Sequence, residues 1–245
     1  MTPAGWPYPR WIAHRGAGKL APENTLAAFR LGAQYGYRAF ECDVKLSRDN
    51  QAFLLHDDTL DRTTHASGDA AARAWSELSQ LDAGGWHSRA FAGEPLASLA
   101  AIAAFCLRNR FALNIEIKPS PGRERETGER VAREAAKLWA GQTVAPLLSS
   151  FAPESLAGAM TGAAALPRAL LLDTLWNGWF ERAQALGCVA VVANHKLFDR
   201  ALVERLHVGG LRALAYTVND DTVAQSLLGL GLDGLITDAV DRFAP

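Results

Sequence analysis

The chain has little cysteine. Its 245 residues include three, Cys42, Cys106 and Cys188, at wide spacings and without a C-x-x-C pair. A disulfide-stabilised scaffold or a zinc knuckle needs paired cysteines at short spacings, so neither is indicated. We therefore expect three buried free thiols.

Long apolar runs and an excess of charge are also missing. No window reaches the roughly 20 apolar residues of a membrane-spanning helix, and residues 1–10 lack the charged start and apolar stretch of a secretory signal. The formal net charge of -1 leaves no basic surplus for nucleic acid or an anionic membrane surface. We expect a soluble cytoplasmic protein with a small-molecule partner, without nucleic-acid binding or stable membrane insertion. The oligomeric state stays open.

A dinucleotide-binding fingerprint is absent as well. The first predicted strand is followed by HRGAG at 14–18, not by G-x-G-x-x-G with an acidic residue about 20 positions on. What remains is an ordinary globular composition, 49% hydrophobic and 21% charged. Barrels of alternating strands and helices commonly run to about 250 residues, so we expect one barrel domain over 1–245, although length alone would also allow two small domains.

Strand and helix patterns alternate along most of the chain. Strands that precede helices are predicted at 11–13, 39–46, 111–117, 146–149, 168–172, 189–193, 212–217 and 234–237, with a short extra hairpin strand at 52–55. Helices are predicted at 24–35, 127–139 and 180–186, and from about 96, 153, 199 and 219. This order favours a TIM-type (β/α)8 barrel of the α/β class, with an open doubly wound sheet as the alternative.

The alternation lapses between 58 and 94, where Thr, Ser, Gly and Asp are frequent. Apolar residues are too sparse there for a second core. We interpret 60–93 as a small inserted segment, placed after the second strand and lying over the barrel mouth.

Polar residues stand at the carboxyl ends of the predicted strands, where such a barrel carries its active site. Glu41 and Asp43 lie two apart on one strand and so share a face, and Glu116 lies on a neighbouring strand. Three partly buried carboxylates repel one another unless a cation lies between them. Magnesium or calcium, which prefer oxygen ligands, is the predicted occupant. The alternative to a cation site is that Glu41 and Asp43 form ion pairs with Lys45, Arg38 or Lys118.

His14 and His56 each end a short strand near these acids. Histidine moves protons near neutral pH, and a pair can divide the work of general acid and general base. Arg15 and Lys118 are suited to a phosphate oxygen, or else simply pair with the three acids. The other histidines are interpreted as structural: His65, His87, His195 and His207.

These residues belong to an ordered set of motifs. They are HRG at 14–16, PENT at 22–25, ECD at 41–43, HDDTLDRTT at 56–64, NIEIKP at 114–119, SSF at 149–151, NHK at 194–196, YTVN at 216–219 and DGLITDAVD at 233–241. The set closely resembles the glycerophosphodiester phosphodiesterase family, most of all its small cytoplasmic bacterial members. Many relatives have proline in the last motif, where this chain has Val240.

The resemblance implies a TIM barrel with an insertion after the second strand, and a role for each matching residue. It implies a cation held by Glu41, Asp43 and Glu116, and acid/base catalysis by His14 and His56. The implied phosphate and substrate contacts are Arg15, Lys118, Tyr216 and Asn219.

The implied activity is metal-dependent hydrolysis of glycerophosphodiesters to sn-glycerol 3-phosphate and an alcohol such as choline, ethanolamine or glycerol. In this family the substrate's own glycerol hydroxyl is thought to attack the phosphorus, giving a cyclic phosphate that water then opens. One alternative is lysophospholipase D-type cleavage of lysophospholipids, with Trp75, Trp86 and Phe91 lining an apolar groove. The other is a non-catalytic phosphate-binding barrel that senses a metabolite.

Overall fold

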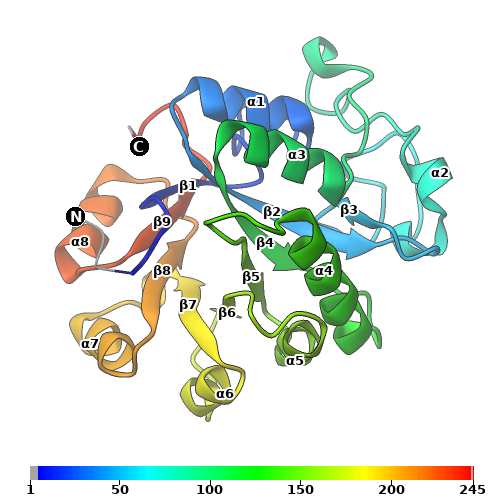
Figure 1. Cartoon of the computed structure of the whole chain (residues 1–245). Helices are drawn as coiled ribbons and strands as arrows, with labels where there is room; N and C mark the ends of the chain where they lie inside the picture. The colour runs from blue at the N-terminus through cyan, green and yellow to red at the C-terminus, as the bar shows by residue number, and fades with distance from the viewer. Residues whose placement is uncertain (1–4, 244) are drawn as a thin grey trace.

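Parallel strands form the centre of the molecule, a computed structural model that describes residues 5–243 and residue 245. Strand β1 (Trp11–Ala13) pairs with β9 (Gly234–Thr237) on one side and with β2 (Ala39–Leu46) on the other, which closes the ring (Figure 1). Between them follow β4 (Ala112–Ile117), β5 (Leu147–Ser150), β6 (Arg168–Leu172), β7 (Cys188–Asn194) and β8 (Arg212–Tyr216). The prediction of a TIM-type (β/α)8 barrel is confirmed, and the open sheet is excluded.

The extra strand lies outside this ring. Strand β3 (Ala52–Leu54) pairs antiparallel with the end of β2, with Val44 opposite Leu54 and Leu46 opposite Ala52. It is the predicted hairpin strand, one residue shorter than expected.

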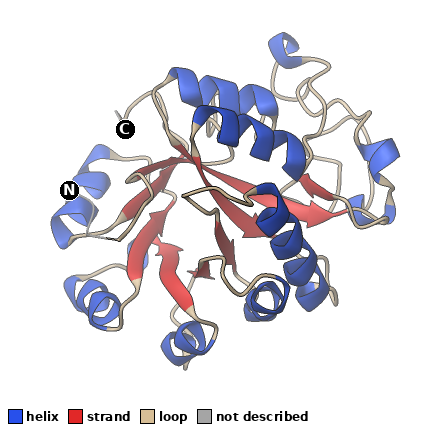
Figure 2. Cartoon of the chain, in the orientation of Figure 1, coloured by secondary structure: helices blue, strands red, loops and turns tan. Residues whose placement is uncertain are grey.

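Helices surround the strands (Figure 2). They are α1 (Leu26–Gln34), α3 (Leu99–Asn109), α4 (Glu124–Leu138), α5 (Pro153–Gly162), α6 (Trp179–Ala185), α7 (Arg200–Val208) and α8 (Asp221–Leu230). Their apolar faces pack on the outward side of the barrel; Phe29 of α1, for example, stacks on Phe40 of β2 with ring centroids 5.1 Å apart. No helix in the described part of the chain is long and apolar enough to cross a membrane.

Several helix starts differ from the prediction by two or three residues, and for α1 and α4 the cause is local. Helix α1 begins at Leu26 because Asn24 has a left-handed backbone (φ 61°) and Thr25 caps the helix, accepting a hydrogen bond from the Ala28 amide. Helix α4 begins at Glu124 instead of residue 127, since the acidic Glu124 and Glu126 favour the positive end of a helix.

Alternation along the strands separates two environments. On β2, Phe40, Cys42 and Val44 lie in the apolar layer beneath the helices. Glu41 and Asp43 therefore face the barrel interior. Below them the interior is apolar, and Trp6 and Tyr8 pack into that cluster. As expected, the three cysteines are buried free thiols.

The segment between β3 and α3 is mostly irregular. It contains η1 (Ala70–Ala72), α2 (Trp75–Leu78) and η2 (Arg89–Phe91), and a further short helix, η3 (His195–Leu197), follows β7. The predicted insertion 60–93 falls in this segment. It has a small apolar cluster of its own, shared with Phe53 of β3: Leu55, Leu60, Ala70, Leu78, Ala83 and Leu96.

Candidate active site

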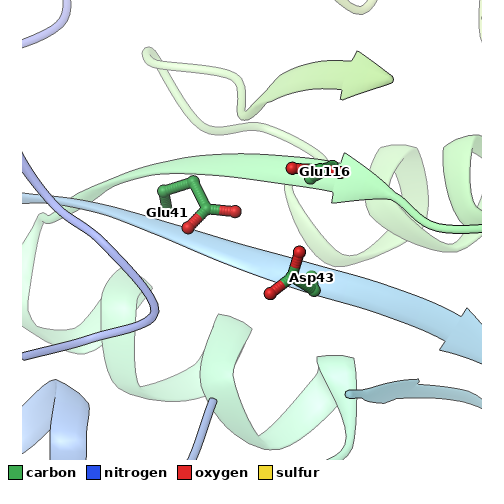
Figure 3. A group of neighbouring side chains, drawn as sticks. All are labelled: Glu41, Asp43 and Glu116. Carbon is green, nitrogen blue, oxygen red and sulfur yellow. The ribbon is translucent and has the colours of Figure 1, made fainter. Parts of the chain in front are cut away.

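Three carboxylates converge at the carboxyl ends of β2 and β4. Glu41 and Asp43 project from β2, and Glu116 stands opposite Asp43 in the register of the two strands (Figure 3). One oxygen from each lies within 4.8 Å of the other two. The residues are 2%, 1% and 9% exposed, so little water reaches them. This spacing suits a single cation.

Burial and crowding act on the titration of these acids. Burial, together with the charges of Asp43 and Glu116, raises the pKa of Glu41. Burial and the Asp43 charge raise the pKa of Glu116 to about 7. Burial alone would also raise the pKa of Asp43, but Arg15 foremost holds it below its usual value. The cluster therefore carries excess negative charge that a cation would relieve.

The donor set fits a hard divalent cation. Glu41 Oε1 and Asp43 Oδ1 are buried and accept no hydrogen bond from any residue that the structure describes. Oxygen ligands of this kind are those preferred by Mg²⁺ and Ca²⁺. The three acids can hold such an ion.

Arg15 and Lys118 border the carboxylates. Arg15 Nε lies 3.1 Å from Asp43 Oδ2, and its Nη1 lies 2.8 Å from Glu23 Oε1. Lys118 Nζ lies 3.2 Å from Glu116 Oε1. Both basic side chains, Arg15 and Lys118, therefore form the ion pairs considered as an alternative. These pairs place them beside the acids, where a phosphate bound to a metal ion at the acids would also lie.

The two other proposed ion-pair partners have different contacts. Lys45 is buried, and its Nζ lies 2.6 Å from Asp58 Oδ1. Arg38 donates to the backbone carbonyls of Gly36 and Tyr37 at 2.9 Å. Neither is paired with the three carboxylates.

His14 is held by an aspartate from the other end of the chain. Its Nδ1 lies 2.6 Å from Asp238 Oδ1, while its Nε2 lies 3.7 Å from Glu41 Oε2. Gly18 has φ +56°, and a Cβ there would lie 2.1 Å from the Asp238 carbonyl oxygen. Glycine at 18 thus lets the loop after β1 close against the residue that holds His14.

His56 has a matching arrangement. Its Nδ1 lies 2.7 Å from Asp57 Oδ1, and Arg62 Nε donates to Asp57 Oδ2 at 2.7 Å. Burial lowers the pKa of His56. The hydrogen bond from Arg62, followed by that from His56, lowers the pKa of Asp57. His56 is therefore a largely neutral base near pH 7 with an ionised partner.

The two histidines line separate cavities. His56 lines one of about 450 Å³ with Glu116, Lys118 and Phe151. The cavity of about 400 Å³ beside His14 is also lined by Arg15, Glu23, Trp86, His87 and Asp238. Each cavity therefore borders the three acids or their ion-pair partners: Glu116 and Lys118 line the His56 cavity, and Arg15 lines the His14 cavity.

The inserted segment reaches the site through Trp86 and His87. Trp86 lines the His14 cavity, and His87 Nε2 lies 3.0 Å from the Lys19 carbonyl oxygen, which joins the insertion to the loop after β1. Trp75 packs near Phe53 instead, with centroids 6.1 Å apart, and Phe91 packs against the main core. Of the three aromatic residues considered for an acyl groove, Trp86 is the one that lines the His14 cavity.

Tyr216 and Asn219 are engaged within the protein. The Tyr216 hydroxyl donates to the Leu172 carbonyl at 3.2 Å, and its ring meets Phe151 edge-on. Asn219 Nδ2 donates to Asp238 Oδ2 at 3.2 Å, and its Oδ1 accepts from the Asp238 amide at 2.8 Å. Asn219 therefore orients the aspartate behind His14.

Other histidines have structural contacts. His65 Nδ1 accepts from the Asp82 amide at 3.1 Å, and His207 Nε2 lies 2.9 Å from Asp233 Oδ2. These contacts agree with the structural interpretation of both residues.

Three supporting residues were not identified as site residues from the sequence: Asn24, Asp57 and Asp238. Asn24 Nδ2 donates to Asp43 Oδ2 at 2.8 Å, and its Oδ1 accepts from the Asp43 amide at 3.1 Å. Each of the three lies inside a quoted motif, PENT, HDD or ITDAVD. Motif membership was the available signal, but it did not say what these side chains touch.

The fold alone does not assign the chain to a family, but a comparison with protein families does. The sequence profile of the glycerophosphoryl diester phosphodiesterase family matches residues 14–242. The chain belongs to this family. The resemblance inferred from the ordered motifs is confirmed.

Its phosphodiesterase relatives include bacterial proteins of similar length. YhdW from Bacillus subtilis is 33% identical and aligns over 94% of each chain. A glycerophosphodiester phosphodiesterase from Caldanaerobacter subterraneus is 32% identical over 93% of each chain. The structure of a phosphodiesterase from Oleispira antarctica, in complex with the product sn-glycerol-3-phosphate, matches with a TM-score of 0.89 and 32% identity, covering 96% of this chain and 95% of its own.

Proposed function

We propose that this phosphodiesterase hydrolyses water-soluble glycerophosphodiesters to sn-glycerol 3-phosphate and an alcohol, using one divalent cation and two histidines. The observation that carries the proposal is the group of three carboxylates within 4.8 Å, bordered by two histidines that each face an aspartate. It occurs in a chain that closely matches the fold of a phosphodiesterase whose complex contains sn-glycerol-3-phosphate.

Glu41, Asp43 and Glu116 would hold the cation, Mg²⁺ or Ca²⁺. When bound, such an ion stabilises negative charge developing on a phosphate oxygen. Arg15 and Lys118 border the same acids and would bind non-bridging phosphate oxygens. Tyr216 and Asn219 would act indirectly, since Tyr216 packs against Phe151 and Asn219 orients Asp238.

The histidines would exchange protons through Nε2. Burial alone would raise the pKa of Asp238, but the hydrogen bond and charge of His14, together with Asn219 and Arg15, lower it below its usual value. Asp57 also has a lowered pKa. An ionised carboxylate only accepts hydrogen bonds, so the facing Nδ1 of each histidine carries a proton. Each ring is thereby held in one tautomer with Nε2 available.

A division of labour follows from the His56 environment. Because burial lowers its pKa, His56 is neutral and can accept the proton of the attacking hydroxyl. His14 would then protonate the oxygen of the departing alcohol. In the second step, in which water opens the cyclic phosphate, the roles reverse.

A lysophospholipid substrate is the second candidate, and Trp86 in the His14 cavity is the feature that would favour it. A panel of glycerophosphocholine, glycerophosphoethanolamine and glycerophosphoglycerol, run beside lysophosphatidylcholine, separates the two. We expect turnover of the three soluble diesters at least 10-fold faster than that of the lysolipid. Faster cleavage of the lysolipid would contradict the proposal, and binding without turnover would support the non-catalytic alternative. A cytoplasmic location stays a prediction.

A further inference from the structure

Two buried polar side chains, Asn114 and Ser149, lie beside the carboxylates. Asn114 is 4% exposed and Ser149 is fully buried. Neither the Oδ1 nor the Nδ2 of Asn114, nor the Oγ of Ser149, has a hydrogen-bond partner among the described residues. A buried polar group without a hydrogen bond destabilises the folded state. Groups of this kind call for a partner that the polypeptide does not supply.

Both side chains share the inner face of the barrel with the acids. Asn114 stands opposite Glu41 in the register of β2 and β4, and Ser149 stands opposite Glu116 in that of β4 and β5. Register partners on parallel strands point to the same side of the sheet. Asn114 also precedes Glu116 by two residues on β4, so both face inward. Each polar side chain therefore lies next to one of the carboxylates.

A partner beneath Asn114 does not suffice. The cavity there has a volume of about 10 Å³ and otherwise apolar walls, apart from Trp6 and Tyr8. That volume is at the lower limit for one water molecule. The Tyr8 hydroxyl donates its only proton to the Ala145 carbonyl and can otherwise only accept, and Trp6 Nε1 is a donor without a partner among the described residues, so one water is the most that this cavity could offer Asn114. One water bridging to Trp6 would satisfy one end of the Asn114 carboxamide and leave the other unpaired.

The other place where Asn114 can find a partner is the side of the three acids, toward the carboxyl ends of the strands. There, Glu41 Oε1 is likewise buried without a hydrogen bond from the described chain. We infer that Asn114 and Ser149 form the inner wall of the cation site and bind the hydrated cation from the barrel interior. This inference rests on the proposed function, because it takes the three carboxylates as the cation's ligands.

The chemistry of the cation agrees with such a wall. Mg²⁺ and Ca²⁺ take six or more oxygen ligands, and Mg²⁺ usually keeps several of its waters. Three carboxylates leave part of that shell open. A carboxamide and a hydroxyl can contact the ion or its waters without adding negative charge to an already crowded cluster. Without the cation these two side chains lack hydrogen-bond partners among the described residues. Binding of the hydrated cation would supply those partners and so increase the affinity for the ion.

The test compares cation affinity with stability in the same variants of the full chain. Isothermal titration with MgCl₂ and CaCl₂ gives the affinity, and thermal unfolding in chelator gives the stability without the ion. We expect Asn114→Leu, which keeps the branching at Cγ but has no polar atom, to weaken cation binding at least 10-fold, as loss of a supporting contact to a metal site typically does. Its melting temperature in chelator should be unchanged or higher, because a buried unpaired carboxamide is removed.

Three further variants complete the test. Ser149→Ala should weaken cation binding several-fold, and Asn114→Asp, which keeps an oxygen, should bind the cation more tightly than Asn114→Leu. Trp6→Phe removes the Nε1–H below the cavity and should leave affinity unchanged. If Asn114→Leu does not fold, the cation affinities of Ser149→Ala and Asn114→Asp test the inference instead.

Two results would overturn the inference. Affinities within twofold of the wild type for Asn114→Leu and Ser149→Ala would remove both residues from the site. A loss of affinity in Trp6→Phe equal to that in Asn114→Leu would assign Asn114 to a bridging water below. Failure of the wild type itself to bind either ion would instead contradict the proposed function, together with this inference.

Discussion

His14 Nδ1 lies 2.6 Å from Oδ1 of Asp238, a residue 224 positions further along the chain. The two meet because β1 pairs with β9, with Ala13 opposite Thr237, so each residue directly follows a paired strand end. Closure of the barrel therefore assembles this pair. His56 obtains its aspartate from the next residue, Asp57, and both histidines end in the same state, with Nε2 available.

Replacing Asp238 tests whether this pairing supports catalysis. We expect Asp238→Asn to lower kcat about 100-fold with little change in KM, because an amide can stabilise the wrong imidazole tautomer. Asp241→Asn, an exposed position nearby, is the matched control and should be near wild type. A kcat for Asp238→Asn within twofold of the control would show that the contact is only structural.

The assignment of acid and base can be tested with the leaving group. A p-nitrophenyl diester of glycerol phosphate releases an anion that needs no proton, so a missing general acid costs little with this substrate. His14→Ala should therefore be about 100-fold or more impaired on glycerophosphocholine but only a few-fold on the p-nitrophenyl diester. His56→Ala should be impaired on both. The reverse pattern would exchange the two roles.

The acid cluster should destabilise the protein when no cation is bound. The pKa of Glu116 rises from 4.5 in the unfolded chain to about 7 in the fold. The folded state thus binds more protons between these values, and the free energy of unfolding falls as pH rises from about 4.5 through 7. Without metal, Glu116→Gln should be about 1–3 kcal/mol more stable than the wild type at pH 8 and show little gain at pH 4.5.

Urea unfolding in chelator at the two pH values measures this difference. Glu204→Gln, an exposed position on α7, serves as the control and should show the same small effect at both. Equal effects of Glu116→Gln at pH 4.5 and pH 8 would mean that its charge is not the source of the instability.

Asn24 should contribute to cation affinity through Asp43. Asn24→Gly keeps the left-handed backbone (φ 61°) accessible and removes both hydrogen bonds to Asp43, so we expect cation affinity to fall by about 10–100-fold. Asn50→Gly is a close control, since Asn50 has φ 63° and bonds to Arg123 instead of an acid of the site. Isothermal titration of both variants decides, and equal affinities would remove Asn24 from the metal site.

The barrel could be predicted because local sequence patterns indicate the order of its strands and helices. Apolar runs of strand length alternate with helical spacing, and Glu41 and Asp43 must share a face because they lie two apart on one strand. The helix boundaries were harder, since the start of α1 depends on the backbone conformation of Asn24. Propensity alone does not show that residue in the left-handed region.

Contacts between distant parts of the chain could not be predicted in the same way. Nothing local to Asp238 indicates that it meets His14, and nothing local to Trp86 indicates that it reaches the His14 cavity. Asn114 was recognisable as an inward neighbour of Glu116, but its lack of a hydrogen-bond partner in the described chain depends on the side chains of other strands and on the apolar cluster below.

The most direct test of the central claim is metal-dependent release of sn-glycerol 3-phosphate from glycerophosphocholine. The wild type should lose turnover in chelator and recover it when Mg²⁺ or Ca²⁺ is restored. Three variants should stay at least 100-fold slower with the ion present: His14→Ala, His56→Ala and Glu116→Ala. Circular dichroism checks that each of them is folded. Full turnover in chelator, or near-normal turnover in any of the three variants, would contradict the account.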